Sequence, residues 1–303
     1  MRQGLGALAL VAALLGTLAL VPASAQDSGR RGALTERLRA RSGGGRGKGS
    51  ESATIAGLTV AIWRPAASGG RTPLVIFSHG FHGTNTQSSF LMRALANAGY
   101  LVVAPNHRDA GGAGGLRERP EMGFGKPDDW TASIYKDRAD DITSLVRALK
   151  ADAKWSASID WSQLALAGHS LGGYTVLGLA GAWSSWKLPE VKAVLALSPY
   201  ASPFINSHTL GALAVPVMYQ GGTRDIGISP FIGKGGGAYD QTASPAYYVE
   251  FESAGHLAWT DLVPTSHSSI EYYSVAFLNR YVRGDRSADP ARRLGDVVRL
   301  SSK

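Results

Sequence analysis

A serine flanked by glycines is the first candidate for chemistry in this sequence. The residues Gly168-His169-Ser170-Leu171-Gly172 match the pattern G-x-S-x-G. In catalytic examples of this pattern the serine lies on a sharp turn between a strand and a helix, and the glycines leave room for that turn. Here the apolar run 163–167 comes before the turn and the Ala/Leu-rich run 174–182 comes after it. We predict that Ser170 is a nucleophile; a plain strand-to-helix turn is the alternative.

A serine hydroxyl is a weak nucleophile, so Ser170 needs a base and an acid that orients the base. When this pattern is catalytic, the acid follows the serine along the chain and a histidine follows the acid. Asp225 comes shortly after the apolar run 215–219, and His256 comes shortly after the run 247–251. Because the carboxyl ends of parallel strands share one edge of a sheet, we expect the three side chains to meet there.

Two N–H groups must receive the negative charge that develops on an attacked carbonyl oxygen. We predict that they belong to Leu171, directly after the nucleophile, and to Phe81, in the loop after the apolar run 74–78. We also expect the side chains of Phe81, His169 and Trp259 to contact the substrate.

Other polar residues have competing interpretations. His208 and His267 are the alternative bases, and Asp240 and Asp261 are the alternative acids. His79 and His82 lie in a loop without a carboxylate, so we predict that they orient the loop and bind no metal. The segment Asn106-His107-Arg108-Asp109 is predicted to form a hydrogen-bonded brace under the site. Residues Asp137, Asp140 and Asp141 are predicted to form a solvated helical face.

The elements that position these residues follow from apolar runs that alternate with helical patterns. Continuous apolar runs of strand length are typical of a buried parallel sheet. They occur at 74–78, 100–104, 163–167, 191–197, 215–219 and 247–251, and the segment 55–63 before them is predicted to be a first strand or a hairpin. Helical spacing occurs at 88–98, 137–150 and 270–281, and the segments 110–131 and 226–243 are predicted to be long loops. This alternation predicts one α/β domain over 54–303, with a mostly parallel, doubly wound sheet of about eight strands flanked by helices.

The N-terminal region has the features of an export signal. Arg2 precedes the apolar run 5–21, and Ala23-Ser24-Ala25 is a typical cleavage site. We predict a cleaved signal peptide over 1–25 and a secreted or periplasmic protein; a retained membrane anchor is the alternative. Residues 26–53 are basic and Gly-rich, which predicts a disordered linker.

Composition excludes several classes of function. The chain has 303 residues, a net charge of +8 and no cysteine, so disulfides, a cysteine nucleophile and thiolate metal sites are excluded. The basic segment has no interleaved aromatic residues, and we expect no nucleic-acid partner. We also expect no stable membrane span, no cofactor, and a monomer.

Several motifs together resemble one branch of the α/β-hydrolases. They are Ser78-His79-Gly80, Asn106-His107-Arg108-Asp109, Gly168-His169-Ser170-Leu171-Gly172-Gly173, Asp225 and Ala254-Gly255-His256. This branch contains platelet-activating-factor acetylhydrolases, dienelactone-hydrolase-like proteins and bacterial cutinase-like polyester hydrolases, and the resemblance spans about 54–283. It implies ester hydrolysis without a cofactor. It also implies a Ser170, Asp225 and His256 triad and oxyanion donors at Phe81 and Leu171.

The chain departs from some members of this branch. It lacks the cysteine nucleophile of dienelactone hydrolases, and it has Leu171 where several cutinase-like enzymes have Met after the nucleophile. We therefore expect a secreted serine esterase for short- to medium-chain acyl esters, with a small-molecule, lipid or polymeric substrate. The enzymatic alternatives are a polyester hydrolase, lipase, peptidase, thioesterase or acyltransferase. A catalytically dead binding module is the non-enzymatic alternative.

Overall fold

The computed structural model describes residues 50–66, 70–111 and 118–303. The predicted signal peptide, over 1–25, and the predicted linker up to residue 49 lie outside the described residues. The first described strand, β1 (Glu51–Ile55), pairs antiparallel with β2 (Leu58–Trp63). The domain boundary predicted at Thr54 therefore falls inside β1, because the backbone of Glu51 is already paired with Ile62.

The described strands form one nine-stranded sheet in the order β1-β2-β4-β3-β5-β6-β7-β8-β9. The remaining strands are β3 (Thr72–Ser78), β4 (Leu101–Pro105), β5 (Ile159–His169), β6 (Val191–Leu197), β7 (Val217–Gly222), β8 (Ala246–Phe251) and β9 (Val297–Ser302). Strands β3 to β8 are parallel, whereas β1, β2 and β9 are antiparallel to their neighbours. This topology confirms the predicted α/β-hydrolase fold; β9 is a strand that we did not predict.

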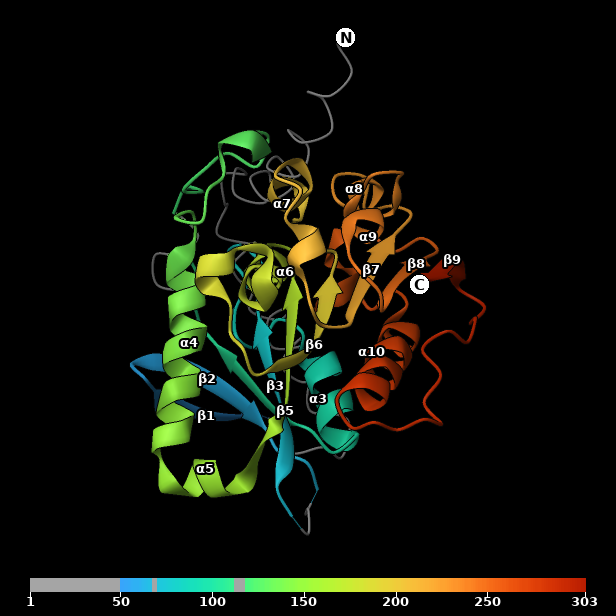
Figure 1. Ribbon diagram of the computed structural model, residues 1–303. Helices are drawn as coiled ribbons and strands as arrows, with labels where there is room; N and C mark the ends of the chain where they lie inside the picture. The colour runs from blue at the N-terminus through green and yellow to red at the C-terminus, as the bar shows by residue number, and fades with distance from the viewer. Residues whose placement is uncertain (1–49, 67–69, 112–117) are drawn as a thin grey trace, which may run out of the picture. The chain divides into compact units, whose positions relative to one another are not determined.

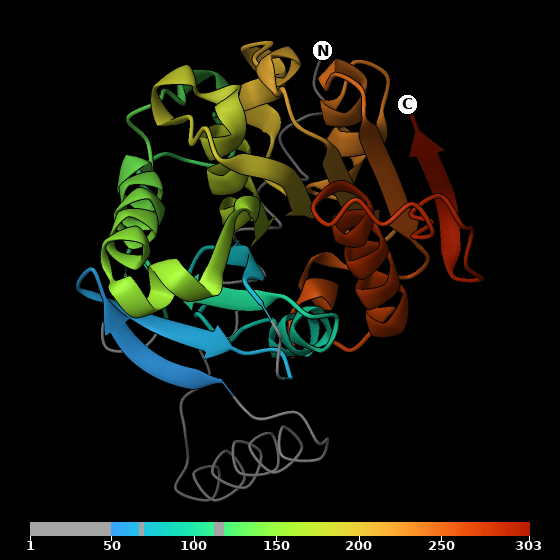
Figure 2. The same cartoon turned by 60° about the horizontal axis from the view of Figure 1, so that its bottom comes forward.

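Helices cover both faces of the sheet (Figures 1 and 2). Helices α3 (Ser89–Asn97) and α10 (His267–Tyr281) lie on one face, and α4 (Lys136–Ala151) and α6 (Leu171–Leu177) lie on the other. Alternate residues of a strand point to opposite faces. Accordingly Val75 and Phe77 of β3 pack in the core under α3 and α10, whereas Leu74 and Ile76 pack in the core under α4 and α6.

Shorter helices lie in the connections between these elements. They are α5 (Ala153–Ser158), α7 (Ser202–Asn206), α8 (Ser229–Gly233) and α9 (Ala238–Gln241). The segment 226–243, predicted to be a loop, thus contains α8 and α9. The helix predicted to extend to residue 182 ends at Leu177 and continues as a π-helical turn over Gly178–Ala182.

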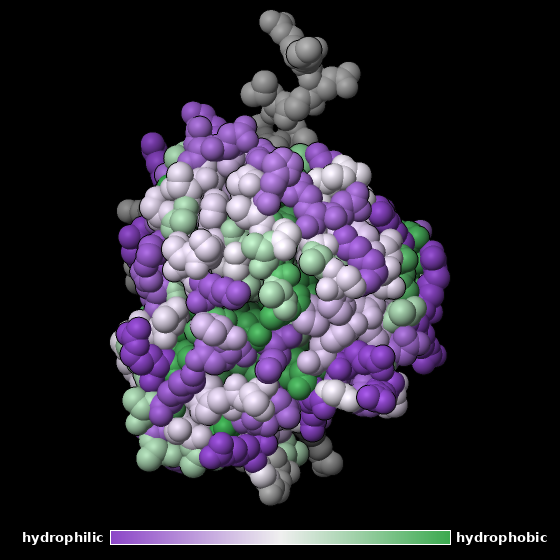
Figure 3. All heavy atoms as spheres, viewed as in Figure 1, coloured by the Kyte–Doolittle hydropathy of each residue, from purple (hydrophilic) through white to green (hydrophobic). Residues whose placement is uncertain are grey.

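The parallel strands determine where a site can form. The arrowheads of β3, β5 and β7 point to the same end of the sheet in Figure 1, and the turns after these strands gather there. The side of the molecule that is viewed in Figure 1 is mostly polar, and its hydrophobic residues are visible mainly in its middle (Figure 3). Within the described ranges, no helix is long and apolar enough to cross a membrane.

Candidate active site

Ser170 lies on a strained turn between β5 and α6. Its φ is 55° and its ψ is −117°, a combination that residues with side chains rarely adopt. The flanking glycines make this turn possible. A Cβ on Gly172 would lie 2.0 Å from Ser78 O, and a Cβ on Gly168 would lie 2.2 Å from Gly172 O. The turn therefore holds Ser170 at the carboxyl edge of the sheet, as the nucleophile prediction requires.

The three residues predicted to form a triad lie in one chain of contacts. Ser170 Oγ is 2.9 Å from His256 Nε2, and His256 Nδ1 is 3.1 Å from Asp225 Oδ1. Asp225 follows β7 and is buried, whereas the side chain of His256, which follows β8, is 22% exposed. A carboxylate accepts hydrogen bonds, so Nδ1 of His256 carries the proton and Nε2 offers a lone pair to Ser170. This arrangement can activate the serine for attack on an acyl carbon.

Two further serines, which the sequence analysis missed, bind the same carboxylate. Ser198 Oγ donates to Asp225 Oδ2 at 2.6 Å and lies 2.9 Å from His256 Nδ1. Ser229 Oγ donates to Asp225 Oδ2 at 2.7 Å. Ser198 directly follows β6, so its position at a strand end was a usable signal. Ser229 begins α8, inside the segment predicted to be a loop, and had no such signal.

The loop after β3 lies beside the nucleophile, since a Cβ on Gly80 would be 3.4 Å from Ser170 Cβ. Most of its N–H groups have partners: Gly80 N donates to Gln87 Oε1 at 3.1 Å, His82 N to Asp109 Oδ2 at 3.4 Å, and Gly83 N to Gly80 O at 2.9 Å. The N–H of Phe81 donates to no atom of the described residues. The Phe81 N–H can therefore donate a hydrogen bond to a substrate atom.

The second predicted donor, Leu171, is the first residue of α6. The N–H groups of a first helical turn have no partner inside their own helix. The helix dipole also favours negative charge at this end. The N–H groups of Phe81 and Leu171 therefore lie on the two segments that flank Ser170 Oγ, as expected of an oxyanion site.

The structure corrects two predicted substrate contacts. The side chains of Trp259 and His169 are 0% and 3% exposed, so neither can contact a substrate. Trp259 Nε1 donates to Gln220 Oε1 at 3.0 Å. His169 Nε2 donates to His256 O at 2.9 Å, while its Nδ1 lies 3.1 Å from Gln87 Nε2. Burial and the nearby His256 hold the pKa of His169 well below its usual value, so the ring stays neutral and anchors the backbone of His256.

Phe81 remains a candidate for substrate contact because its side chain is half-buried at the site. Its ring stacks on His82 with centroids 3.8 Å apart and meets Phe124 and Tyr135 edge-on. Two further aromatic residues, Trp130 and Tyr200, are buried and pack around Phe124. They support the wall behind Phe81.

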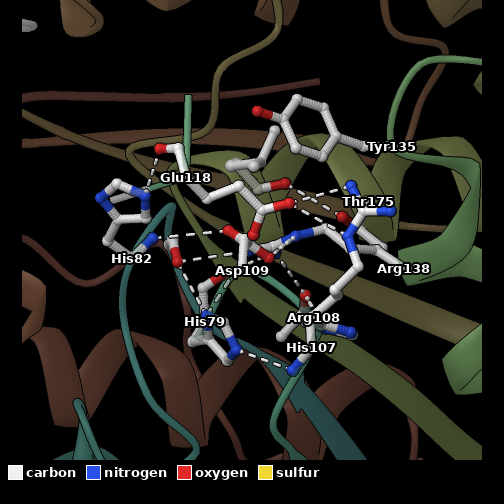
Figure 4. Close-up of polar contacts among 12 residues, drawn as sticks. His79, His82, His107, Arg108, Asp109, Glu118, Tyr135, Arg138 and Thr175 are labelled. Carbon is white, nitrogen blue, oxygen red and sulfur yellow. Dashed lines mark hydrogen bonds and ion pairs between the residues drawn. The ribbon is translucent and has the colours of Figure 1, made fainter. Parts of the chain in front are cut away.

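A buried polar network lies under the loop that carries Phe81 (Figure 4). Arg138, which is 0% exposed, donates to Asp109 Oδ1 at 3.0 Å and to Asp109 Oδ2 at 2.7 Å. Burial alone would raise the pKa of Asp109, but Arg138 lowers it below its usual value. Sequence analysis missed Arg138, although it lies four residues before Ile142 and therefore on the buried face of α4.

His107 extends this network to α4. Its Nε2 lies 2.9 Å from Ser78 Oγ and its Nδ1 lies 2.8 Å from Asp141 Oδ2. Burial and the charge of Arg138 hold the pKa of His107 well below its usual value. Burial raises the pKa of Asp141 to about 6. Asp141 therefore does not belong to a solvated face, contrary to the prediction, because α4 turns it toward His107; Asp140, by contrast, is exposed and pairs with Lys136.

The alternative bases and acids, except for His208, are engaged in other contacts. His267 stacks on Phe90 and lies 3.2 Å from Thr260 O, while His208 is exposed. Asp261 accepts from the N–H of Phe90, and Asp240 accepts from the N–H of Gly236. Within the described part of the chain, no three residues are grouped so that they could hold a metal ion.

The chain is similar in sequence to several cutinases. The chain is 27% identical over 215 residues to the cutinase est1 of Thermobifida alba, across 70% of this chain and 61% of that protein. It is 26% identical over 221 residues to the cutinase est2 of the same organism, across 70% of this chain and 60% of that protein. It is also 26% identical to cutinase 2 of Thermobifida cellulosilytica, across 70% of this chain and 69% of that protein.

These matches confirm the predicted resemblance to cutinases, although the aligned region spans only about three fifths of the length of est1 and est2. A family model adds a name that the sequence analysis did not reach. The model described as Chlorophyllase matches residues 46–213, which include Ser170 and end before Asp225 and His256. Because this match covers more than half of the chain, the protein belongs to the chlorophyllase family of α/β-hydrolases.

Proposed function

We propose that this protein is a carboxylic ester hydrolase that acts through Ser170, His256 and Asp225. One observation carries the proposal: Ser170 Oγ, on its strained turn, is 2.9 Å from His256 Nε2, whose opposite ring nitrogen is 3.1 Å from a buried carboxylate. A serine in this setting is activated for attack on a carbonyl carbon. Similarity to the cutinases supports an ester as the substrate.

The reaction proceeds in two halves. His256 Nε2 takes the proton of Ser170 as Oγ bonds to the ester carbonyl carbon, and the carbonyl oxygen becomes an oxyanion held by the N–H groups of Phe81 and Leu171. Each such donor is typically worth about 3 kcal/mol in the transition state. The alkoxide then leaves with the proton from His256. Water, deprotonated by His256, then attacks the acyl carbon, the bond from that carbon to Ser170 Oγ breaks, and Oγ takes the proton back from His256 as the acid is released. Asp225 stabilises the imidazolium in both halves.

Hydrolysis of p-nitrophenyl esters from acetate to palmitate, by the wild type and by Ser170→Ala, tests this proposal. We expect turnover in the wild type, greatest for short to medium acyl chains, and its loss in the variant. If the wild type hydrolyses no ester, or the variant keeps full activity, the proposal is wrong. Parallel assays with peptide anilides and acyl thioesters separate a peptidase or a thioesterase from an esterase, and transfer of the acyl group to an added alcohol would indicate an acyltransferase.

Polyester hydrolysis is the second candidate, and one structural observation favours it. Among the large hydrophobic side chains of the described residues, Ile226 and Leu262 are 56% and 67% exposed. Ile226 directly follows Asp225, and Leu262 lies in the segment after His256, so both belong to the segments that carry the triad. Apolar side chains that are exposed on these two segments would suit a water-insoluble substrate. Release of soluble acid from an aliphatic polyester film, compared with p-nitrophenyl butyrate hydrolysis, tests this candidate.

We also propose export with removal of residues 1–25, and a monomeric mature chain. The signal-like composition of that segment supports export. N-terminal sequencing of protein recovered outside the cytoplasm is expected to begin at Gln26, and light scattering is expected to give the mass of one chain. An uncleaved N-terminus would favour the membrane-anchor alternative.

A further inference from the structure

The orientation of the Phe81 N–H depends on the carbonyl of the residue before it. The C=O of Gly80 and the N–H of Phe81 belong to one planar peptide unit, in which the two groups of a trans bond point in opposite directions. Any group that holds Gly80 O therefore also aims the Phe81 N–H. Three donors converge on this oxygen: Gly83 N at 2.9 Å, His79 Nδ1 at 2.7 Å and Arg138 Nη2 at 3.2 Å.

Arg138 binds the loop at two successive carbonyls. Besides its contact with Gly80 O, its Nη1 donates to His79 O at 2.7 Å. The guanidinium is held from its other side by both carboxylate oxygens of Asp109, as Figure 4 shows. A planar guanidinium held by a fork of this kind has little freedom to move. Helix α4 thus fixes the loop through one rigid cation.

His79 supplies the second side-chain donor to Gly80 O in a defined protonation state. Its Nε2 accepts the N–H of His107 at 3.0 Å, so the ring proton lies on Nδ1, which faces Gly80 O. Burial, with Arg138 and His107 nearby, holds the pKa of His79 well below its usual value. The ring is therefore neutral and keeps this tautomer across the working pH range.

We propose that Arg138, locked by Asp109, is a positioning residue that aims and polarises the peptide whose N–H receives the oxyanion. The positive charge at Gly80 O draws electron density toward that oxygen and makes the Phe81 N–H a stronger donor. The effect is large only because the guanidinium is buried, where charges are weakly screened. This proposal rests on the proposed ester hydrolysis, in which Phe81 supplies an oxyanion donor.

Two variants test the proposal without leaving a lone buried charge. Arg138→Lys keeps the charge but loses the fork, and the double variant Arg138→Gln with Asp109→Asn removes both charges together. Arg147→Gln, on the exposed side of the same helix, is the matched control. Thermal unfolding checks folding, and stoichiometric labelling by a p-nitrophenyl phosphonate counts the molecules with a reactive Ser170.

We expect kcat per labelled site to fall about 10- to 100-fold in the double variant and less in Arg138→Lys, with KM changed by less than about threefold. A boronic acid forms a tetrahedral adduct on serine that resembles the transition state. Its inhibition constant is expected to rise by the same factor as kcat falls. The control variant should match the wild type in both values.

Other results would overturn the proposal. If the folded double variant keeps the wild-type kcat, or kcat falls while boronic acid affinity stays unchanged, Arg138 does not act through the oxyanion donor. A wild type without esterase activity would instead refute the proposed function, before any variant is compared.

Discussion

Replacement of Asp225 by Asn tests how the structure controls the tautomer of His256. Asp225 Oδ2 accepts two hydroxyl hydrogen bonds, from Ser198 at 2.6 Å and from Ser229 at 2.7 Å, while Oδ1 faces His256 Nδ1. In the Asp225→Asn variant one oxygen becomes an NH₂ group. The remaining oxygen is expected to stay with the two serines, because only an acceptor satisfies both hydroxyls. The NH₂ then faces His256 Nδ1 and forces the ring proton onto Nε2, where it blocks proton transfer from Ser170.

The size of the effect follows from these contacts. Each neutral hydrogen bond contributes about 1 kcal/mol, so two serine donors favour the inactive orientation by about 2 kcal/mol, or about 30-fold. Loss of the negative charge beside the imidazolium adds to this factor. The expected fall in kcat is about 10³- to 10⁴-fold, the range found when the acid of such a triad becomes an amide.

Removal of the two serines provides the decisive comparison. In the Asp225→Asn background, Ser198→Ala with Ser229→Ala frees the amide to turn its oxygen to His256, so kcat is expected to rise by up to about 30-fold. In the Asp225 background the same two substitutions are expected to lower kcat, because the carboxylate loses two of its donors. Hydrolysis of p-nitrophenyl butyrate by all four proteins measures both effects. If the serine substitutions lower kcat in both backgrounds, the orientation argument is wrong.

Three further predictions concern other parts of the molecule. Gly172→Ala is expected to lower the free energy of unfolding, measured in urea, by about 3 kcal/mol or more, because its Cβ would lie 2.0 Å from the backbone oxygen of Ser78 and a backbone atom cannot easily move away. An unchanged free energy of unfolding would contradict this packing. The pKa of Asp141 is raised to about 6 in the folded protein, so the folded state binds this proton more tightly than the unfolded state does. The resulting contribution to the free energy of unfolding is present at low pH and is lost as the pH rises through about 6. The advantage of the wild type over Asp141→Asn in free energy of unfolding should therefore shrink between about pH 4 and 7, by at most about 3 kcal/mol and by less after solvent screening; a difference that grows with pH would show the sign to be wrong. Ile226→Ser with Leu262→Ser is expected to slow polyester film hydrolysis at least about threefold while leaving p-nitrophenyl acetate turnover unchanged, and equal losses on both substrates would argue against a surface contact.

The supporting residues of the site were harder to predict than its reactive ones. Ser170, Asp225 and His256 could be proposed from one turn motif, two strand ends and the order along the chain. The roles assigned to His169 and Trp259 were wrong, since both side chains turn into the core, where they contact His256 and Gln220. Adjacency in sequence to a reactive residue does not reveal on which side of the sheet edge a side chain lies.

By itself, the sequence determined the parallel strands, the longer helices and their order along the chain, but not β9, α8 or α9. Apolar runs separated by helical patterns predicted a parallel sheet, because a strand buried on both faces and a helix with one apolar stripe have different periods. The glycines around Ser170 predicted the sharp turn, because a turn this tight leaves no room for side chains at the neighbouring positions.

Only the tertiary structure decided which distant groups share a charge or a proton. Arg138 and Asp109 pair across two elements, and Ser198 and Asp225 meet across two strand ends. No local pattern records such pairs, since each depends on how the elements pack. The free energy of a buried charge depends on the groups that surround it in space, and the packing of the helices on the sheet decides which groups these are.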